Sequence, residues 1–170
     1  MTEAERREVI GRGKWAIHGV PHKGWVCVDE DDLGEPSAIC EMCETMEIRY
    51  VHYMRHDNYP ETLGCGKICA GHMADDYAGA ERRERKMMSR AVRRARWLRR
   101  SGWRWSMKGN EFINVDGYNI AVFQHDDGSW GARILDRRTN ETTPAQRRYP
   151  TSDSAKLAAF DRMMRLKDRR

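Results

Sequence analysis

The C-terminal part of the chain alternates apolar and polar side chains, which is the pattern of β-strands with one buried face. Two such runs, residues 111–115 and 118–123, flank Asp116-Gly117, a dipeptide that strongly favours a two-residue hairpin. A third run, residues 130–135, follows a turn at residues 126–128. These runs predict three consecutive antiparallel strands.

Further along, apolar residues recur every three or four positions between Ala155 and Leu166, which predicts an amphipathic helix. Ser152 or Asp153 can cap its first turn, because both side chains accept hydrogen bonds from free backbone amides. One helix packed on three antiparallel strands would make residues 109–170 a small α+β domain.

A hairpin and a long helix are expected in the N-terminal half. Alternation over residues 48–55 leads into a turn at residues 57–60, after a short strand at 25–28 and an acidic turn at 29–35. From Cys69 to about Arg100 the apolar period is helical, so we expect one long helix there. Its apolar positions are Met73, Tyr77, Ala80, Met87, Ala91, Ala95 and Leu98.

Four of the five cysteines form two closely spaced pairs around this hairpin: Cys40 with Cys43, and Cys65 with Cys69. Zn2+ takes four nitrogen or sulfur ligands in a tetrahedron, and two such pairs supply them from a turn and a helix start. We therefore predict a structural Zn2+ bound by these four cysteines. His72, about one helical turn beyond Cys69, is the alternative fourth ligand in place of Cys65.

Two disulfides, or unpaired buried thiols, are the competing interpretations of the same cysteines. Disulfides suit secreted chains, whereas the charged residues 1–7 lack the apolar core of a secretory leader. Cys27 stands alone between two valines and is expected to be a small buried hydrophobe.

The charge of the chain is concentrated in one segment. The 170 residues carry a net charge of +5, but residues 81–108 hold 12 Lys and Arg against two Asp and Glu, whereas residues 1–80 hold eight against 15. Such a basic block indicates a polyanionic partner or an internal electrostatic contact. The mean hydropathy is −0.87, and no apolar run approaches the ~20 residues of a membrane span, so we expect a cytoplasmic protein that does not enter membranes.

These patterns predict an α+β chain in four parts. A polar arm (1–14) precedes a zinc-binding module (15–80), an Arg-rich helix or linker (81–108) and a βββα domain (109–170). A knuckle, a hairpin and a helix that carries the last ligands follow one another as in a treble-clef zinc finger, which the module resembles.

Residues 130–161 resemble the Apetala-type DNA-binding domain of plants. The similarity lies in a Trp-x-Ala-Arg-Ile-x-Asp strand at 130–136, an Arg-Tyr-Pro-Thr run at 148–151 and an Ala-x-x-Ala-Ala-Phe-Asp run at 155–161. This resemblance implies that Arg133, with Arg137 and Arg138, lies on or beside an exposed face of the sheet.

The whole chain is similar to a family of bacterial zinc-knuckle proteins with no assigned activity. The matching segments are residues 19–25, the Cys40 knuckle, and residues 48–56, 69–73 and 108–122. The resemblance implies that both halves belong to one architecture.

Nucleic-acid binding, with DNA favoured over RNA, is the first functional hypothesis. Ten of the 12 cations in residues 81–108 are arginines, whose guanidinium groups suit phosphates and guanine edges. Trp97, Trp103 and Trp105 lie among them and can stack on exposed bases. A solvated helix face and core tryptophans are the competing interpretation. The expected binding residues are Arg90, Arg93, Arg94, Arg96, Arg99, Arg100, Arg133, Arg137 and Arg138.

A protein-binding adapter or inhibitor is the second hypothesis. In that case the zinc is purely structural, and the acidic residues 29–35 mimic nucleic acid or dock a basic partner.

The third hypothesis is an HNH-like nuclease, the one enzyme among the three. Some such enzymes carry a hairpin and a helix on a four-cysteine zinc site, with a His, an Asn and a second His in that order. The Asp that usually precedes the first His is absent here, which argues against a catalytic metal. The candidates in that order are His52 or His56, Asn58 and His72.

Overall fold

A computed structural model describes residues 9–144 and 147–169 of the chain, and it has the expected α+β class. The chain divides into two compact units, Met1–Ala91 and Val92–Arg170. The basic segment 81–108 is therefore divided between the units. Much of the predicted polar arm, residues 1–8, lies outside the described residues.

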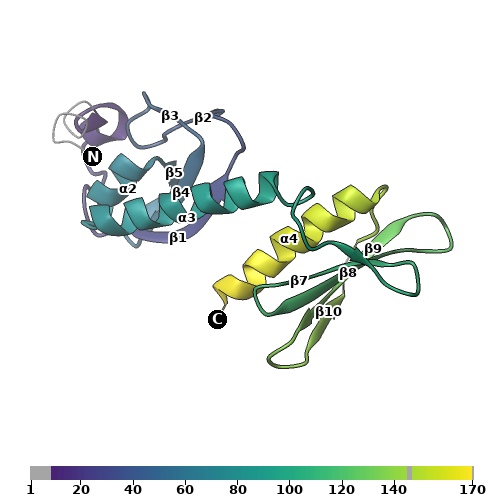
Figure 1. Cartoon of the computed structure of the whole chain (residues 1–170). Helices are drawn as coiled ribbons and strands as arrows, with labels where there is room; N and C mark the ends of the chain where they lie inside the picture. Colours follow the sequence, from purple (N-terminus) through teal and green to yellow (C-terminus); the bar gives the residue numbers. More distant parts are fainter. Residues whose placement is uncertain (1–8, 145–146, 170) are drawn as a thin grey trace. The chain divides into compact units, whose positions relative to one another are not determined.

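The first unit is built on a three-stranded antiparallel sheet in the order β1-β4-β5, with a separate pair, β2-β3, beside it (Figure 1). Its elements are η1 (Gly13–Ala16), β1 (Val26–Asp32), β2 (Ala38–Ile39), β3 (Glu47–Ile48), β4 (Tyr50–His56), β5 (Tyr59–Cys65), α2 (Lys67–Met73) and most of α3 (Tyr77–Ala95). The pairing of β2 with β3 closes the loop that carries Cys40 and Cys43.

The acidic stretch predicted as a turn at 29–35 is largely strand. β1 runs to Asp32 and pairs with β4 along most of its length. The Arg49 guanidinium contacts the Asp32 carboxylate at 2.7 Å, which offsets part of the repulsion among the acidic side chains. Pairing with a neighbouring strand thus overrides the local turn preference.

The single helix expected from Cys69 to Arg100 is in fact two helices. Asp75 has a left-handed backbone with φ 54°, which ends the first helical segment. The Asp76 carboxylate then caps α3 by accepting a hydrogen bond from the Gly79 amide at 2.7 Å. Gly71 allows Tyr77 to pack closely across the break, since a Cβ at position 71 would lie 2.6 Å from the Tyr77 ring.

The second unit contains a five-stranded antiparallel sheet in the order β10-β9-β8-β7-β6. Its elements are β6 (Arg104–Trp105), β7 (Glu111–Val115), β8 (Tyr118–Gln124), β9 (Trp130–Asp136), β10 (Thr142–Pro144) and α4 (Ser152–Asp168). The three central strands were predicted, but the edge strands β6 and β10 are too short to show an alternating pattern. Asp116 and Gly117 both have positive φ, as the predicted hairpin turn requires.

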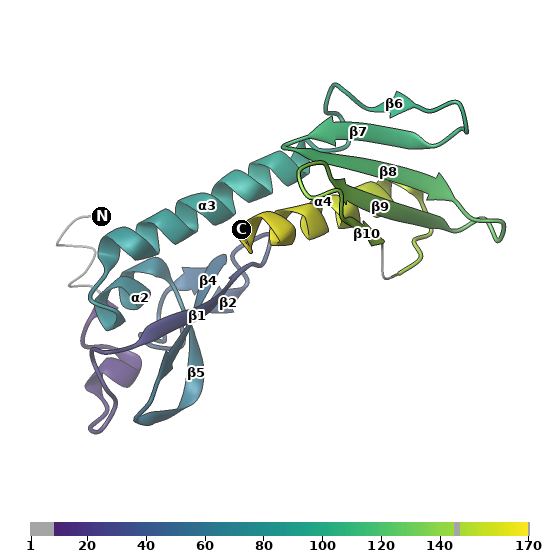
Figure 2. The same ribbon diagram turned by 90° about the horizontal axis from the view of Figure 1, so that it is seen from below.

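One face of this sheet is covered by α4, as Figures 1 and 2 show. Ile120, Val122 and Ile134 are buried in the same cluster as Phe160 and Met163 of α4. Burial of side chains of this size contributes about 1.5–3 kcal/mol each.

The capping residue of α4 is Thr151, one position before the predicted Ser152 or Asp153. Its hydroxyl accepts a hydrogen bond from the Ser154 amide at 3.1 Å, and the Ser154 hydroxyl accepts one from the Thr151 amide. Among the described residues, no helix is long and apolar enough to cross a membrane.

Candidate functional site: a cysteine cluster and a cationic surface

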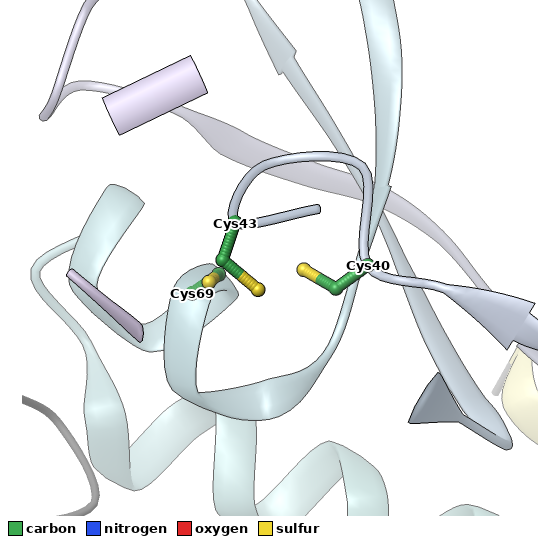
Figure 3. A group of neighbouring side chains, drawn as sticks. All are labelled: Cys40, Cys43 and Cys69. Carbon is green, nitrogen blue, oxygen red and sulfur yellow. The ribbon is translucent and has the colours of Figure 1, made fainter. Parts of the chain in front are cut away.

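Three of the predicted zinc ligands lie together in the first unit. The sulfur atoms of Cys40, Cys43 and Cys69 are all within 4.8 Å of one another, and all three residues are buried. Figure 3 shows their side chains converging from the loop between β2 and β3 and from α2. Two sulfurs bound to one Zn2+ lie at most about 4.6 Å apart, twice the Zn–S bond of about 2.3 Å. The cluster is thus close to the size that one metal ion spans.

Hydrogen-bond donors point at these sulfurs, which favours the thiolate form that metals bind. The amide of Gly66 donates to Cys40 Sγ at 3.5 Å, and the amide of Cys43 contacts the same sulfur. The hydroxyl and the amide of Thr45 contact Cys43 Sγ and act to lower the pKa of that thiol. The local backbone is therefore arranged to stabilise negative charge on sulfur.

The sulfur atoms are close enough to perturb one another strongly. Hydrogen bonds from Cys43, Cys65 and Cys69 hold the pKa of the Cys40 thiol far below its usual range. The same contact with Cys40 raises the pKa of Cys43 to about 12, and it also raises the pKa of Cys65 and of Cys69. The thiols are therefore strongly coupled, and a bound divalent cation would favour the thiolate form of each cysteine that it contacts.

Cys65 and His72, the two candidates for a fourth ligand, differ in their surroundings. Cys65 is fully buried, contacts the sulfur of Cys40, and donates to Met73 Sδ at 3.6 Å. His72 Nδ1 lies 2.9 Å from the Tyr77 hydroxyl, and its ring contacts Trp15 edge-on. The compact triad includes neither residue.

Cys27 lies outside the cluster, as expected, although it is only partly buried. Its thiol donates to the Asp29 carbonyl at 3.4 Å, and burial raises its pKa. It provides a natural control for the cluster cysteines.

A cavity of about 180 Å3 is lined in part by Cys40, Cys43 and Cys69. Its rim includes Lys67 and Glu84, whose side chains form an ion pair at 3.1 Å. Ile48 and Ile68 form apolar parts of the cavity wall.

The candidate histidines of the nuclease hypothesis do not come together as one group of metal ligands among the described residues. His52 is fully buried, neither ring nitrogen has a hydrogen-bond partner among the described residues, and burial lowers its pKa to about 4. His56 packs against Trp25, and its Nδ1 accepts a hydrogen bond from the Asn58 amide. Within the described ranges, the cysteine triad is the one metal-sized group of three or more His, Cys, Asp or Glu ligands.

The nine arginines expected to bind nucleic acid have three kinds of surroundings. Arg93 contacts the Asp116 carboxylate at 2.5 Å, and Arg94 contacts Asp161 at 2.9 Å, so the second unit uses both for internal ion pairs. Arg90 is half-buried on α3. The other six are exposed and have no ion-pair partner among the described residues: Arg96, Arg99, Arg100, Arg133, Arg137 and Arg138.

The three tryptophans of the basic segment also have different roles. Trp97 is buried in the second core, and its indole donates to the Lys156 carbonyl at 2.8 Å. Trp103 is partly buried beneath the Lys156 ammonium group. Trp105 alone of the three is exposed, at 67%. Two of them therefore match the core interpretation rather than base stacking.

The face of the second sheet opposite α4 carries residues that the sequence patterns did not single out. Phe112 pairs with Ala121 and Arg104, and Ala121 pairs with Arg133, so the four form one row across the strands. Ala121 lies between the buried Ile120 and Val122, which places this row on the face away from α4. Arg104 was missed because its strand has only two residues. Alternation alone could have placed Phe112 on this face.

A comparison of the chain with protein-family models, with curated proteins and with solved structures finds no match, so the function is inferred from the geometry and charge of these sites.

Proposed function

We propose that this protein binds nucleic acid, with DNA favoured over RNA, through the cationic surface of its second unit, and that a structural Zn2+ stabilises its first unit. The observation that carries the first part is a surplus of unpaired positive charge. Residues 92–170 hold 18 Lys and Arg against nine Asp and Glu. Several carboxylates are already neutralised by Arg93, Arg94, Lys156 and Lys167.

The exposed arginines are suited to phosphate contact because guanidinium stays charged and can bind two oxygens at once. Arg99 and Arg100 follow α3, Arg133 lies in β9, and Arg137 and Arg138 follow that strand. Their charge can be satisfied by a polyanion without breaking any ion pair of the described residues.

The metal part of the proposal rests on the donor set. Buried thiolates select Zn2+ or iron–sulfur chemistry over hard cations such as Mg2+, and a single ion bound by thiolates is best matched by Zn2+. The cluster lies within the core formed around Trp15, Met42 and Met73, so metal binding is coupled to folding of that core. This role is structural, and the knuckle, the β4-β5 hairpin and α2 follow the treble-clef order.

Cys65 is the proposed fourth ligand because its sulfur already contacts that of Cys40, whereas His72 pairs with Tyr77. We expect Cys65→Ser to weaken Zn2+ binding by more than the ~10–100-fold that loss of a hydrogen bond to a ligand costs. His72→Ala should change affinity less than about threefold. Competition with a chromophoric chelator measures both, and a large loss at His72 with none at Cys65 would reverse the assignment.

Binding of the wild-type protein to duplex and single-stranded DNA should weaken steeply with salt. Each phosphate contact releases condensed counterions, so the slope of log K against log salt is about −0.9 per contact on duplex and about −0.7 on single strands. With four to six contacts we expect a slope of roughly −3 to −5. Fluorescence anisotropy over a salt series measures it, and affinity no tighter than millimolar at low salt would refute the proposal.

A further inference from the structure

The uncovered face of the second sheet differs in composition from the rest of the surface. It presents Phe112, Phe123, Asn114, Asn119 and the two arginines, Arg104 and Arg133. The strand carboxylates Glu111 and Asp136 pair with Val122 and Tyr118, both buried on the α4 side, so they belong to the other face. The uncovered face therefore carries cations and aromatic rings. Among the described strand residues, no carboxylate lies on it.

The row across this face places positive charge on both sides of an apolar centre. Neighbouring strands lie about 4.8 Å apart, so Arg104 and Arg133 flank Phe112 and Ala121 over three strand spacings, roughly 14 Å. Ala121 has a small side chain, which leaves the surface low beside the Phe112 ring. A planar group can lie in that position while the arginines reach anionic groups at its margins.

A second aromatic ring lies diagonally from the first. Phe123 is two residues along β8 from Ala121, the partner of Phe112, and diagonal neighbours on a sheet are about 7–8 Å apart. Its ring lies against Gly131, since a Cβ there would come within 3.0 Å of it, and His125 supports it edge-on at 5.2 Å between centroids. The two rings can therefore receive two successive planar groups.

We propose that this face binds single-stranded DNA, with bases stacked on Phe112 and Phe123 and phosphates held by Arg104 and Arg133. Base faces are covered in a duplex and become available to aromatic side chains only when the strands are apart. Stacking on aromatic rings and contacts to phosphates need no ribose 2′-hydroxyl, so the strand is assigned as the DNA that the proposed function favours. This inference rests on the proposed nucleic-acid function and names its substrate class.

The test is fluorescence anisotropy of the full chain with a labelled oligodeoxythymidylate, an oligouridylate of equal length and a mixed-sequence duplex. The wild type should bind the oligodeoxythymidylate most tightly. Phe112→Leu, which keeps an apolar side chain but removes the ring, should weaken that binding by about tenfold or more, and Phe112→Trp should retain it. Arg104→Gln with Arg133→Gln should reduce the salt slope by about 1.4, since each contact contributes about 0.7 on a single strand.

Met107→Ala is the control, because this fully exposed apolar side chain lies between β6 and β7, outside the row of residues on the uncovered face. It should leave the affinity unchanged. Melting curves identify any variant that fails to fold. If Phe112→Leu does not fold, the double variant Arg104→Gln, Arg133→Gln still tests the face. Equal or tighter binding of duplex or of oligouridylate, or no effect at Phe112 in a folded variant, overturns the inference while the proposed function stands. Binding of none of the three probes refutes the proposed function itself.

Discussion

Replacing Cys69 by Ser is expected to prevent stable folding of the first unit. Free energies of structural Zn2+ binding are about 10–16 kcal/mol in zinc-finger peptides, whereas a whole domain is stable by only about 5–15 kcal/mol. Cys69 is buried in the triad, so its replacement removes a ligand and leaves a hydroxyl among sulfurs. Elemental analysis should show Zn2+ falling from one per chain to a small fraction, together with loss of the cooperative melting transition.

Cys27→Ser is the matched control for this experiment. Its thiol is partly exposed and its hydrogen bond goes to the Asp29 carbonyl, which a serine hydroxyl can also reach. We expect a change of less than about 1 kcal/mol in the free energy of unfolding and full Zn2+ content. Equal losses of metal and stability at positions 27 and 69 would contradict the assignment of the cluster as the metal site. Retention of full stability after complete removal of Zn2+ by a chelator would contradict its structural role.

Substitutions at two neighbouring pairs of arginines, Arg99 with Arg100 and Arg93 with Arg94, are expected to have opposite effects. The first pair should change DNA binding, and the second should change the stability of the protein. Arg99→Gln with Arg100→Gln should reduce the salt slope for duplex DNA by up to about 1.8 and weaken binding at low salt by at least tenfold. These side chains are exposed and have no carboxylate partner among the described residues, so the melting temperature should change little. The measurement is anisotropy over a salt series, paired with thermal unfolding.

The pair Arg93→Gln with Arg94→Gln removes the same net charge and is therefore the control. Arg93 and Lys167 both contact Asp116, and Arg94 contacts Asp161, so these substitutions break ion pairs within the second unit. Partly exposed pairs contribute up to about 1 kcal/mol each, which predicts a lower melting temperature and a nearly unchanged salt slope. An identical loss of affinity in both double variants would show that only total charge matters, and that the exposed arginines make no specific phosphate contact.

The sequence by itself determined the features that depend on residues close together along the chain. The Asp116-Gly117 turn is encoded by the ease with which these residues adopt positive φ. Helix α4 is encoded by its apolar period and by a hydroxyl cap, although the cap is Thr151, one residue before the predicted position. The close spacing of Cys40 and Cys43 marks one half of the metal site in the same way. The α+β class follows from such local signals taken together.

The tertiary structure alone decided the features that depend on partners distant in sequence. Arg93 and Arg94 look like Arg99 and Arg100 in the sequence, and only Asp116 and Asp161, brought near by the fold, separate them. The break at Asp75 is coupled to the packing of Gly71 against Tyr77, a contact that helical periodicity cannot reveal. The uncovered sheet face arises from strand register, because a two-residue strand such as β6 has no periodic pattern of its own and gains its place only by pairing with β7.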